Sequence, residues 1–411
     1  MSDLKSEDVS IRITSVFMKI IGLWMAANRS EQRVRNITVT YSLIAILIGL
    51  WIQTTDLYHS WGDFGACLYN TCNILSLIMP LFKILVLLAH KNDFFNLILY
   101  LQRKFLHADY NDCERTILLR CKRQCTLFIC FFTIFTQATI LFYFINPVIA
   151  NIGRNASDRL LPFNMWVNLP LTETPYYEMT YVLQTLSLYH IGVGYFCFDN
   201  FLCIMNLHVA TQFRILQHRM ENIAHLVEKG KQEGNIKVNV SSPYFATECY
   251  TVLKNYIRQH QKLIAYCTKL EEVFNTIILI QLLIFSLLMC LDGYQILMAN
   301  TPIRTRLIFT CHFMACMCQL LMFTYSCDCI IRESSNTAEA VYSGPWTLLS
   351  MTASGRMLRK DLTLIILRSS VPCYLTAKGF FAVSLETYTK VLSTAASYFT
   401  LLKQNSETAD I

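Results

Sequence analysis

The feature that most constrains the fold of this chain is a series of long stretches without a single charged residue. A helix needs roughly 20 mainly apolar residues to cross a bilayer, and each stretch is close to that length. Only 15% of all residues are charged, whereas soluble globular domains carry roughly a quarter. We therefore predict an all-α membrane protein, in which six uncharged stretches cover residues 37–55, 64–82, 124–153, 179–198, 273–291 and 307–327.

A seventh span is predicted near the carboxyl end of the chain. Lys378, Glu386 and Lys390 interrupt it, and charges deep in lipid are costly. We expect this helix to pack against its neighbours or to face water rather than lipid. The chain, residues 1–411, is then one seven-span unit, with spans at about 37–55, 64–89, 124–147, 179–203, 273–299, 306–331 and 373–403.

The orientation follows from lysine and arginine, which are more frequent in cytosolic loops. Residues 1–35 hold six of them, residues 147–178 hold two and residues 207–272 hold nine. This alternation places the amino terminus in the cytosol and the carboxyl terminus outside. A G-protein-coupled receptor has the opposite orientation, so that class is disfavoured. The net charge of +7 is spread over several loops, so no nucleic acid partner is expected.

No catalytic or metal-binding pattern stands out in the sequence. The spans contain no His/Glu metal set and no Ser/His pair at a workable spacing. Cys327 and Cys329 are too close together for the C-x2-C pairs of zinc sites. We therefore expect no enzymatic activity, no cofactor and no metal. The charges of Lys83, Asp199 and Asp292 fall near span ends and are interpreted as reaching the interface.

Long connections on the cytosolic side, about 207–272 and 332–372, are predicted to extend the spans as helices. In one of them apolar residues recur at helical spacing, which is typical of an amphipathic helix. Its apolar face can pack on another copy of the same region or lie on the inner leaflet, and we favour an anchor region for subunit assembly. Outside, Asn155 begins the glycosylation sequon Asn-Ala-Ser in the loop 147–178.

The last predicted span carries a mainly polar stripe. Thr394, Ser397, Leu401 and Gln404 follow one another at spacings of three, four and three residues, which places them on one helix face. A polar stripe interrupted by one large apolar residue is what a water path with a hydrophobic gate requires. The alternative is a buried packing helix whose small residues allow close contacts.

The carboxyl-terminal part of the chain resembles the insect odorant receptors. The stretch 331–346 contains Ile-Arg-Glu-Ser-Ser, then Ala-Val-Tyr and then Trp346, similar to that family's cytosolic segment after the sixth span. Residues 378–385 and 397–402 look like its last helix. The size, the inverted topology and the long inner helices agree with the family over the whole chain.

The resemblance implies a tetrameric, ligand-gated, non-selective cation channel whose central pore is lined by the last helix of each subunit. An odour-specific subunit assembles there with a shared olfactory co-receptor in the plasma membrane of olfactory sensory neurons. The loop between spans four and five is shorter here than in the co-receptor, so this chain looks like the odour-specific partner. The resemblance places the apolar gate at Leu401 and a pore-facing amide at Gln404. Lys390 and Lys403 depart from the small or apolar residues of the co-receptor.

The resemblance also implies an apolar pocket for a small volatile odorant in the outer half of the membrane, among spans two to six. No acid or base lies in that zone, so a neutral odorant with a carbonyl, ester or alcohol group is expected. Each aromatic candidate can instead be an ordinary packing residue. The candidates are Tyr69, Asn73, Thr136, Thr139, Tyr143, Tyr181, Thr185, Tyr189, Phe285 and Met289.

Two alternative functions remain open at this point. A gustatory receptor of the same superfamily ends its last helix with Thr-Tyr, five apolar residues and Gln, and residues 397–404 come close to that. A small-molecule transporter would need broken helices and a site at the middle of the membrane. Dependence on the olfactory co-receptor separates these two functions from an odorant receptor.

Overall fold

The computed structural model describes residues 8–26, 28–106, 108–155, 158–163, 165, 170–223, 225, 243–297 and 302–409. The fold is all-α, as predicted, apart from an isolated bridge between Thr376 and Ala382. Its elements are α1 (Val9–Ile21), α2 (Arg29–His59), α3 (Phe64–Ala89), α4 (Lys91–Tyr100), the π-helix η2 (Leu101–Leu106), α5 (Asp112–Ala150), α6 (Tyr176–Glu221), α8 (Pro243–Leu297), α9 (Ile303–Tyr342), the 3-10 helix η4 (Pro345–Leu348), α10 (Ala353–Ser369) and α11 (Leu385–Ala409).

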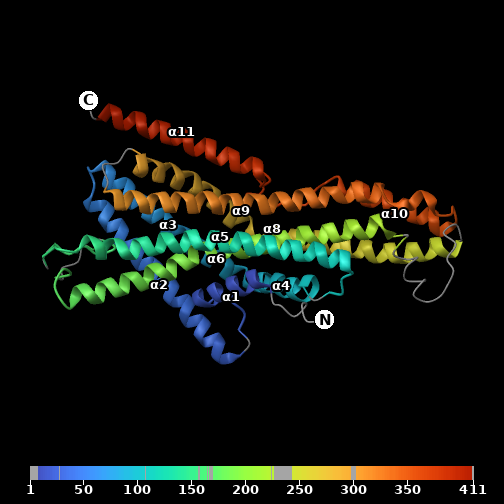
Figure 1. Cartoon of the computed structure of the whole chain (residues 1–411), viewed down its shortest axis with the longest axis horizontal. Helices are drawn as coiled ribbons and strands as arrows, with labels where there is room; N and C mark the ends of the chain where they lie inside the picture. Colours follow the sequence, from blue (N-terminus) through green and yellow to red (C-terminus); the bar gives the residue numbers. More distant parts are fainter. Residues whose placement is uncertain are drawn as a thin grey trace.

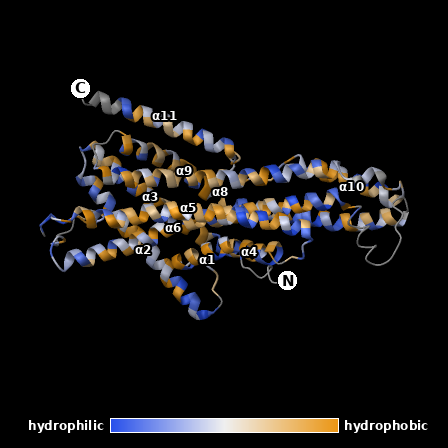
Figure 2. Ribbon diagram, viewed as in Figure 1, coloured by the Kyte–Doolittle hydropathy of each residue, from blue (hydrophilic) through white to orange (hydrophobic). Residues whose placement is uncertain are grey.

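The long helices α5, α6, α8 and α9 run side by side along the long axis of the molecule, and α11 diverges from them (Figure 1). Hydrophobic residues dominate the half of the bundle that holds α3 and α5, while polar and apolar residues alternate towards α10 (Figure 2). Among the helices that the structure describes, six are long and apolar enough to cross a membrane, namely α2, α3, α5, α6, α8 and α9. The chain is therefore a multi-pass membrane protein.

Three of these helices continue without a break beyond their predicted spans. α6 reaches Glu221, α8 begins at Pro243 and α9 ends at Tyr342. Because α10 packs against α8 and α9, these extensions form a second helical bundle at one end of the molecule. α6 lies at the centre, and nearly all its side chains from Val193 to Ala210 are buried.

The interpretation of Lys83 and Asp199 as interfacial charges is wrong. Lys83 Nζ lies 2.7 Å from Asp199 Oδ2, and both side chains are almost fully buried. Lys83 also donates to the carbonyl oxygen of Tyr195 at 3.0 Å, while the Gln281 and Gln319 amides donate to Asp199. A buried ion pair is tolerated only when such additional hydrogen bonds satisfy it. The pair therefore joins α3, α6, α8 and α9 inside the bundle.

The last helix is shorter than the predicted span 373–403, because α11 begins only at Leu385. A tight turn precedes it, closed by backbone bonds from Val383 to Leu375 and from Ala377 to Phe381. Lys378 and Gly379 adopt φ angles of 53° and 83°, a left-handed conformation that no α-helix contains and that glycine adopts readily. The Lys-Gly dipeptide thus lies in this turn, outside the last helix.

Candidate functional site

A cavity of about 360 Å³ lies between α2, α3, α5 and α6. Apolar side chains supply most of its wall, among them Ile48 of α2, Leu77 of α3 and Ile140 of α5. The loop that precedes α6 covers one side through Phe163, Met165 and Leu171. The volume falls within the range of roughly 300–1,000 Å³ that is typical of small-molecule sites.

Three polar side chains form a chain across one wall of the cavity. Asn73 of α3 donates to Gln53 Oε1 of α2 at 3.2 Å. The Tyr143 hydroxyl of α5 donates to Asn73 Oδ1 at 3.5 Å, and the Tyr143 ring stacks on Phe163 at 6.0 Å between ring centroids. Because the Tyr143 bond is at the long limit for a hydrogen bond, its hydroxyl can turn to an oxygen of a bound ligand.

The loop over the cavity is fixed by the side-chain amide of one residue on α6. Gln184 Nε2 donates to the carbonyl oxygen of Phe163 at 3.0 Å, and its Oε1 accepts from the Phe163 N–H at 3.0 Å. These two bonds hold both backbone groups of Phe163. The ring of Phe163 is therefore positioned against Tyr143 at the edge of the cavity.

A basic side chain borders the cavity, contrary to the expectation that no acid or base does. His312 of α9 is part of the lining together with Tyr195 of α6. Its Nδ1 lies 2.8 Å from Oδ2 of Asp292, whose side chain is fully buried. The interpretation of Asp292 as an interfacial charge is therefore wrong, and the contact could not be foreseen from the sequence because His312 lies on a different helix.

Four of the ten predicted pocket residues line this cavity: Asn73, Thr136, Thr139 and Tyr143. The Thr136 and Thr139 hydroxyls donate to carbonyl oxygens of their own helix, at 3.1 and 3.0 Å. Their donors are thus occupied, and towards the cavity they offer an oxygen acceptor and a methyl group.

The other six do not line it, and helix geometry explains why. On α6 the lining residues form one stripe at spacings of three and four, which includes Thr180, Gln184, Leu188 and Ile191. The positions that directly follow the first three, Tyr181, Thr185 and Tyr189, lie on another face of the helix. Tyr181 donates to the Phe144 carbonyl oxygen at 2.7 Å, and Tyr69 packs edge-on against Phe309. The residues outside the lining are Tyr69, Tyr181, Thr185, Tyr189, Phe285 and Met289, and the last two are buried in the core.

The sequence did not lead us to expect that α2, or the side-chain amides of Gln53 and Gln184, would line the cavity. Seven lining residues come from α2, the first span, which was not expected to contribute. Gln53 and Gln184 could have been noticed, because an amide inside an apolar span is costly to bury without partners. Both have hydrogen-bond partners here.

The predicted stripe of α11 is exposed along its length. Thr394, Ser397 and Gln404 are exposed, as is Leu401 with 57% of its surface. The opposite face packs on the bundle, where Ala395 is buried. Lys390 Nζ lies 2.7 Å from the Glu386 carboxylate in an exposed pair on the same helix. Asn155, the predicted glycosylation site, is also exposed, while Ala156 and Ser157 of its sequon lie outside the described residues.

Comparison with known proteins identifies relatives of this chain. The family model described as "7tm Odorant receptor" matches residues 63–396. Odorant receptor 13a of Drosophila melanogaster is 24% identical, with 96% of this chain and 95% of the relative covered. Odorant receptor 10 of Aedes albopictus is 23% identical, with 88% and 91% covered.

A solved structure shares the fold. The insect olfactory receptor OR5 from Machilis hrabei, solved in complex with eugenol, superposes with a TM-score of 0.81 at 15% identity, and the match covers 98% of this chain and all of that one. The two sequence relatives are named as odorant receptors and not as enzymes.

Proposed function

The chain belongs to the 7tm odorant receptor family, and from this premise we propose that it is the odorant-binding subunit of a ligand-gated, non-selective cation channel. In this proposal it assembles with an olfactory co-receptor, as a tetramer, in the plasma membrane of olfactory sensory neurons. A small volatile binds between α2, α3, α5 and α6 and opens a pore lined by α11. The family match favours this function over that of a gustatory receptor or a transporter.

The observation that carries the ligand part of the proposal is the apolar cavity with its few polar groups. A volume of about 360 Å³ suits a small molecule. Tyr143 and Asn73 can bond one or two oxygen atoms of a ligand. His312 is already paired with Asp292, so the cavity favours a neutral carbonyl, ester or alcohol. The receptor OR5 of the same fold was solved with a small phenol, eugenol.

The pore part of the proposal is supported by the exposed face of α11. A helix with Thr394, Ser397 and Gln404 exposed needs water or another subunit rather than lipid. In a tetramer with the co-receptor, Leu401 of each copy of this chain would contribute to an apolar constriction, which closes a pore by excluding water. Lys390 is paired with Glu386, which balances its charge near the cation path.

The topology in the proposal has seven spans, with α11 as the last. It places the amino terminus in the cytosol, because lysine and arginine are concentrated on that side. The extensions of α6, α8 and α9 then lie in the cytosol with α10. Their bundle is the proposed anchor region between subunits.

The test is whole-cell current from cells that express this chain with and without an insect olfactory co-receptor, during exposure to volatile esters, alcohols and ketones. We expect an odorant-evoked inward cation current only when both chains are present. Leu401→Ala should raise the current at rest, whereas Leu127→Ala, on an exposed position of α5, should not. An absent current despite verified surface expression of both chains would refute the proposal.

A further inference from the structure

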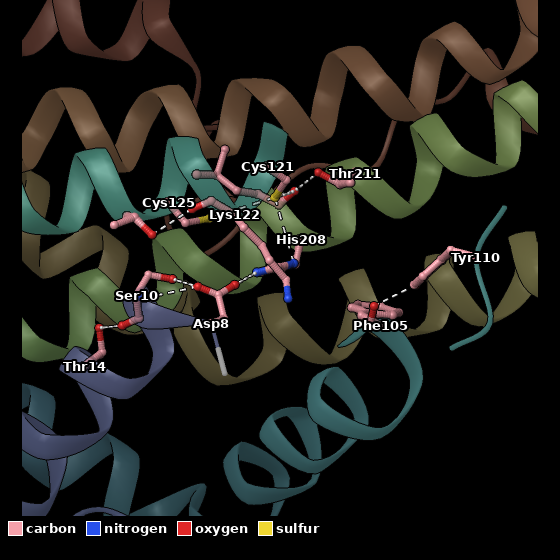
Figure 3. Close-up of polar contacts among 12 residues, drawn as sticks. Asp8, Ser10, Thr14, Phe105, Tyr110, Cys121, Lys122, Cys125, His208 and Thr211 are labelled. Carbon is pink, nitrogen blue, oxygen red and sulfur yellow. Dashed lines mark hydrogen bonds and ion pairs between the residues drawn. The ribbon is translucent and has the colours of Figure 1, made fainter. Parts of the chain in front are cut away.

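Two cysteines and a histidine gather where α5 packs against α6 (Figure 3). None of the three lines the ligand cavity. Cys121 and Cys125 lie one turn apart on α5, and His208 lies on α6. All three side chains are buried. Their Sγ and nitrogen atoms lie within 4.8 Å of one another, so one small ion could contact all three.

Two of the three distances between the ligand atoms are close to those of a tetrahedral zinc site. The Sγ atoms of Cys121 and Cys125 are 4.0 Å apart, and Cys121 Sγ lies 3.9 Å from His208 Nδ1. With zinc bonds of about 2.3 Å to sulfur and about 2.0 Å to nitrogen, tetrahedral angles place two sulfurs about 3.8 Å apart and a sulfur about 3.5 Å from a nitrogen. The third distance, from Cys125 Sγ to the His208 nitrogen, is within 4.8 Å, so side-chain shifts of at most about 1.3 Å would complete the site.

A carboxylate orients the imidazole for such a role. His208 Nε2 lies 3.2 Å from Asp8 Oδ2, and the other oxygen of Asp8 accepts from the N–H and hydroxyl of Ser10 at 3.1 and 2.6 Å. With Nε2 donating its proton to Asp8, Nδ1 presents its lone pair to the cysteines. Metal-binding histidines commonly have this carboxylate behind them.

A disulfide or a pair of neutral packed thiols accounts for the cluster less well than a metal ion does. A disulfide requires a bond of about 2.05 Å, and both cysteines are free. Apart from the cluster, Cys121 contacts the Leu207 carbonyl oxygen at 3.5 Å and the Thr211 side chain, and neither contact accounts for the positions of Cys125 and His208 beside it. Two thiolates neutralise the charge of a divalent zinc ion, and the nearby Lys122 offsets the charge of the Asp8 carboxylate. A water molecule can take the fourth position of zinc.

We propose that Cys121, Cys125 and His208 bind one zinc ion, with Asp8 as the carboxylate that orients His208. Because Asp8 also caps α1, the ion would fasten α1 to α5 and α6. The site lies beside the predicted spans 124–147 and 179–203, at the proposed cytosolic edge. No metal was expected from the sequence, because the third ligand comes from a different helix.

The test is the zinc content of the full chain, purified in detergent from insect cells and measured by inductively coupled plasma mass spectrometry. We expect about one zinc ion per chain, and at least a tenfold lower content in the double variant Cys121→Ser, Cys125→Ser. The matched control is Cys113→Ser, Cys130→Ser on the same helix, which should keep the zinc. Asp8→Asn should bind zinc about 10–100-fold more weakly in competition with a chelator.

A second measurement keeps the proposal testable if the double variant does not fold. Cobalt(II) exchanged into the wild-type chain should give the near-ultraviolet charge-transfer absorption of cobalt bound to thiolates. A zinc content far below one ion per chain, together with no such band, would overturn the proposal. Equal zinc in the wild type and the double variant would overturn it as well.

Discussion

The hydroxyl group of Tyr143 on α5 lies 3.5 Å from Oδ1 of Asn73 on α3, at the wall of the cavity. Asn73 in turn donates to Gln53 on α2, so three helices meet in one polar chain. The surrounding wall is mainly apolar. This polar chain is therefore the part of the cavity that can distinguish an oxygenated ligand from a hydrocarbon.

Tyr143→Phe should weaken responses to oxygenated ligands. Loss of one hydrogen bond of about 1–1.5 kcal/mol raises the half-maximal concentration about fivefold to tenfold. Tyr181→Phe is the matched control, because the Tyr181 hydroxyl donates to the Phe144 carbonyl oxygen away from the cavity. Concentration–response curves of whole-cell current measure both. Equal losses in the two variants would argue against a ligand contact by Tyr143.

Gln184→Leu should release the loop over the cavity, because both bonds to Phe163 are lost. We expect a higher half-maximal concentration and a faster decay of the current when the odorant is washed out. Arg159→Gln breaks an exposed ion pair with Glu178 at the start of the same helix, and such pairs contribute little. This control should behave like the wild type, and an unchanged decay in Gln184→Leu would contradict a role of the loop in retaining ligand.

The sequence predicted the helical spans well, because their signal is local. An uncharged run of about 20 residues has few alternatives to a spanning helix, and six such runs became α2, α3, α5, α6, α8 and α9. The predicted start of the last helix, residue 373, was twelve residues too early, because α11 begins at Leu385. The left-handed turn at Lys378 and Gly379 is set by two single residues, which hydropathy does not register.

The cavity was only partly predictable, because it depends on how each helix is rotated. On α6 the candidates Tyr181, Thr185 and Tyr189 are each one residue from a position that lines the cavity. One residue turns a helix by about 100°, which moves a side chain to another face. The pairing of Lys83 with Asp199 was missed for a related reason, since it joins helices far apart in the sequence.

Removal of the half-buried cation that pairs with a buried carboxylate should destabilise the proposed anchor region. Arg219 makes two bonds to the Glu114 carboxylate, at 2.6 and 2.9 Å, and Glu114 is buried. Arg219→Met leaves that carboxylate unpaired, which costs about 3–5 kcal/mol, so the melting temperature in detergent should fall clearly. Adding Glu114→Gln removes the unpaired carboxylate and should restore part of the lost melting temperature. Lys269→Met, from the exposed pair with Glu272, should have almost no effect, and an equal fall there would contradict this account.

Acid should destabilise the extension of α8 through His260. Burial, aided by the nearby Arg368 charge, lowers the pKa of His260 from 6.5 to about 4. The unfolded chain therefore binds this proton first as the pH falls, and stability is lost between about pH 6.5 and pH 4, by at most about 3 kcal/mol. Above pH 7, His260 is neutral in both the folded and the unfolded chain, so it does not make stability depend on pH. His260→Phe should show a smaller fall in melting temperature from pH 7.5 to 5, and an identical fall would refute the assignment.

The central claim is that the cavity between α2, α3, α5 and α6 binds the odorant that opens the channel. The most direct test fills the cavity with a larger side chain, in the variant Thr139→Phe on its wall. The control is Ile134→Phe, on an exposed face of the same helix. Both are expressed with the olfactory co-receptor, and odorant-evoked current is recorded at matched surface expression. We predict that Thr139→Phe abolishes the response or raises the half-maximal concentration at least tenfold, while Ile134→Phe leaves it unchanged. Wild-type concentration dependence in Thr139→Phe would contradict the claim.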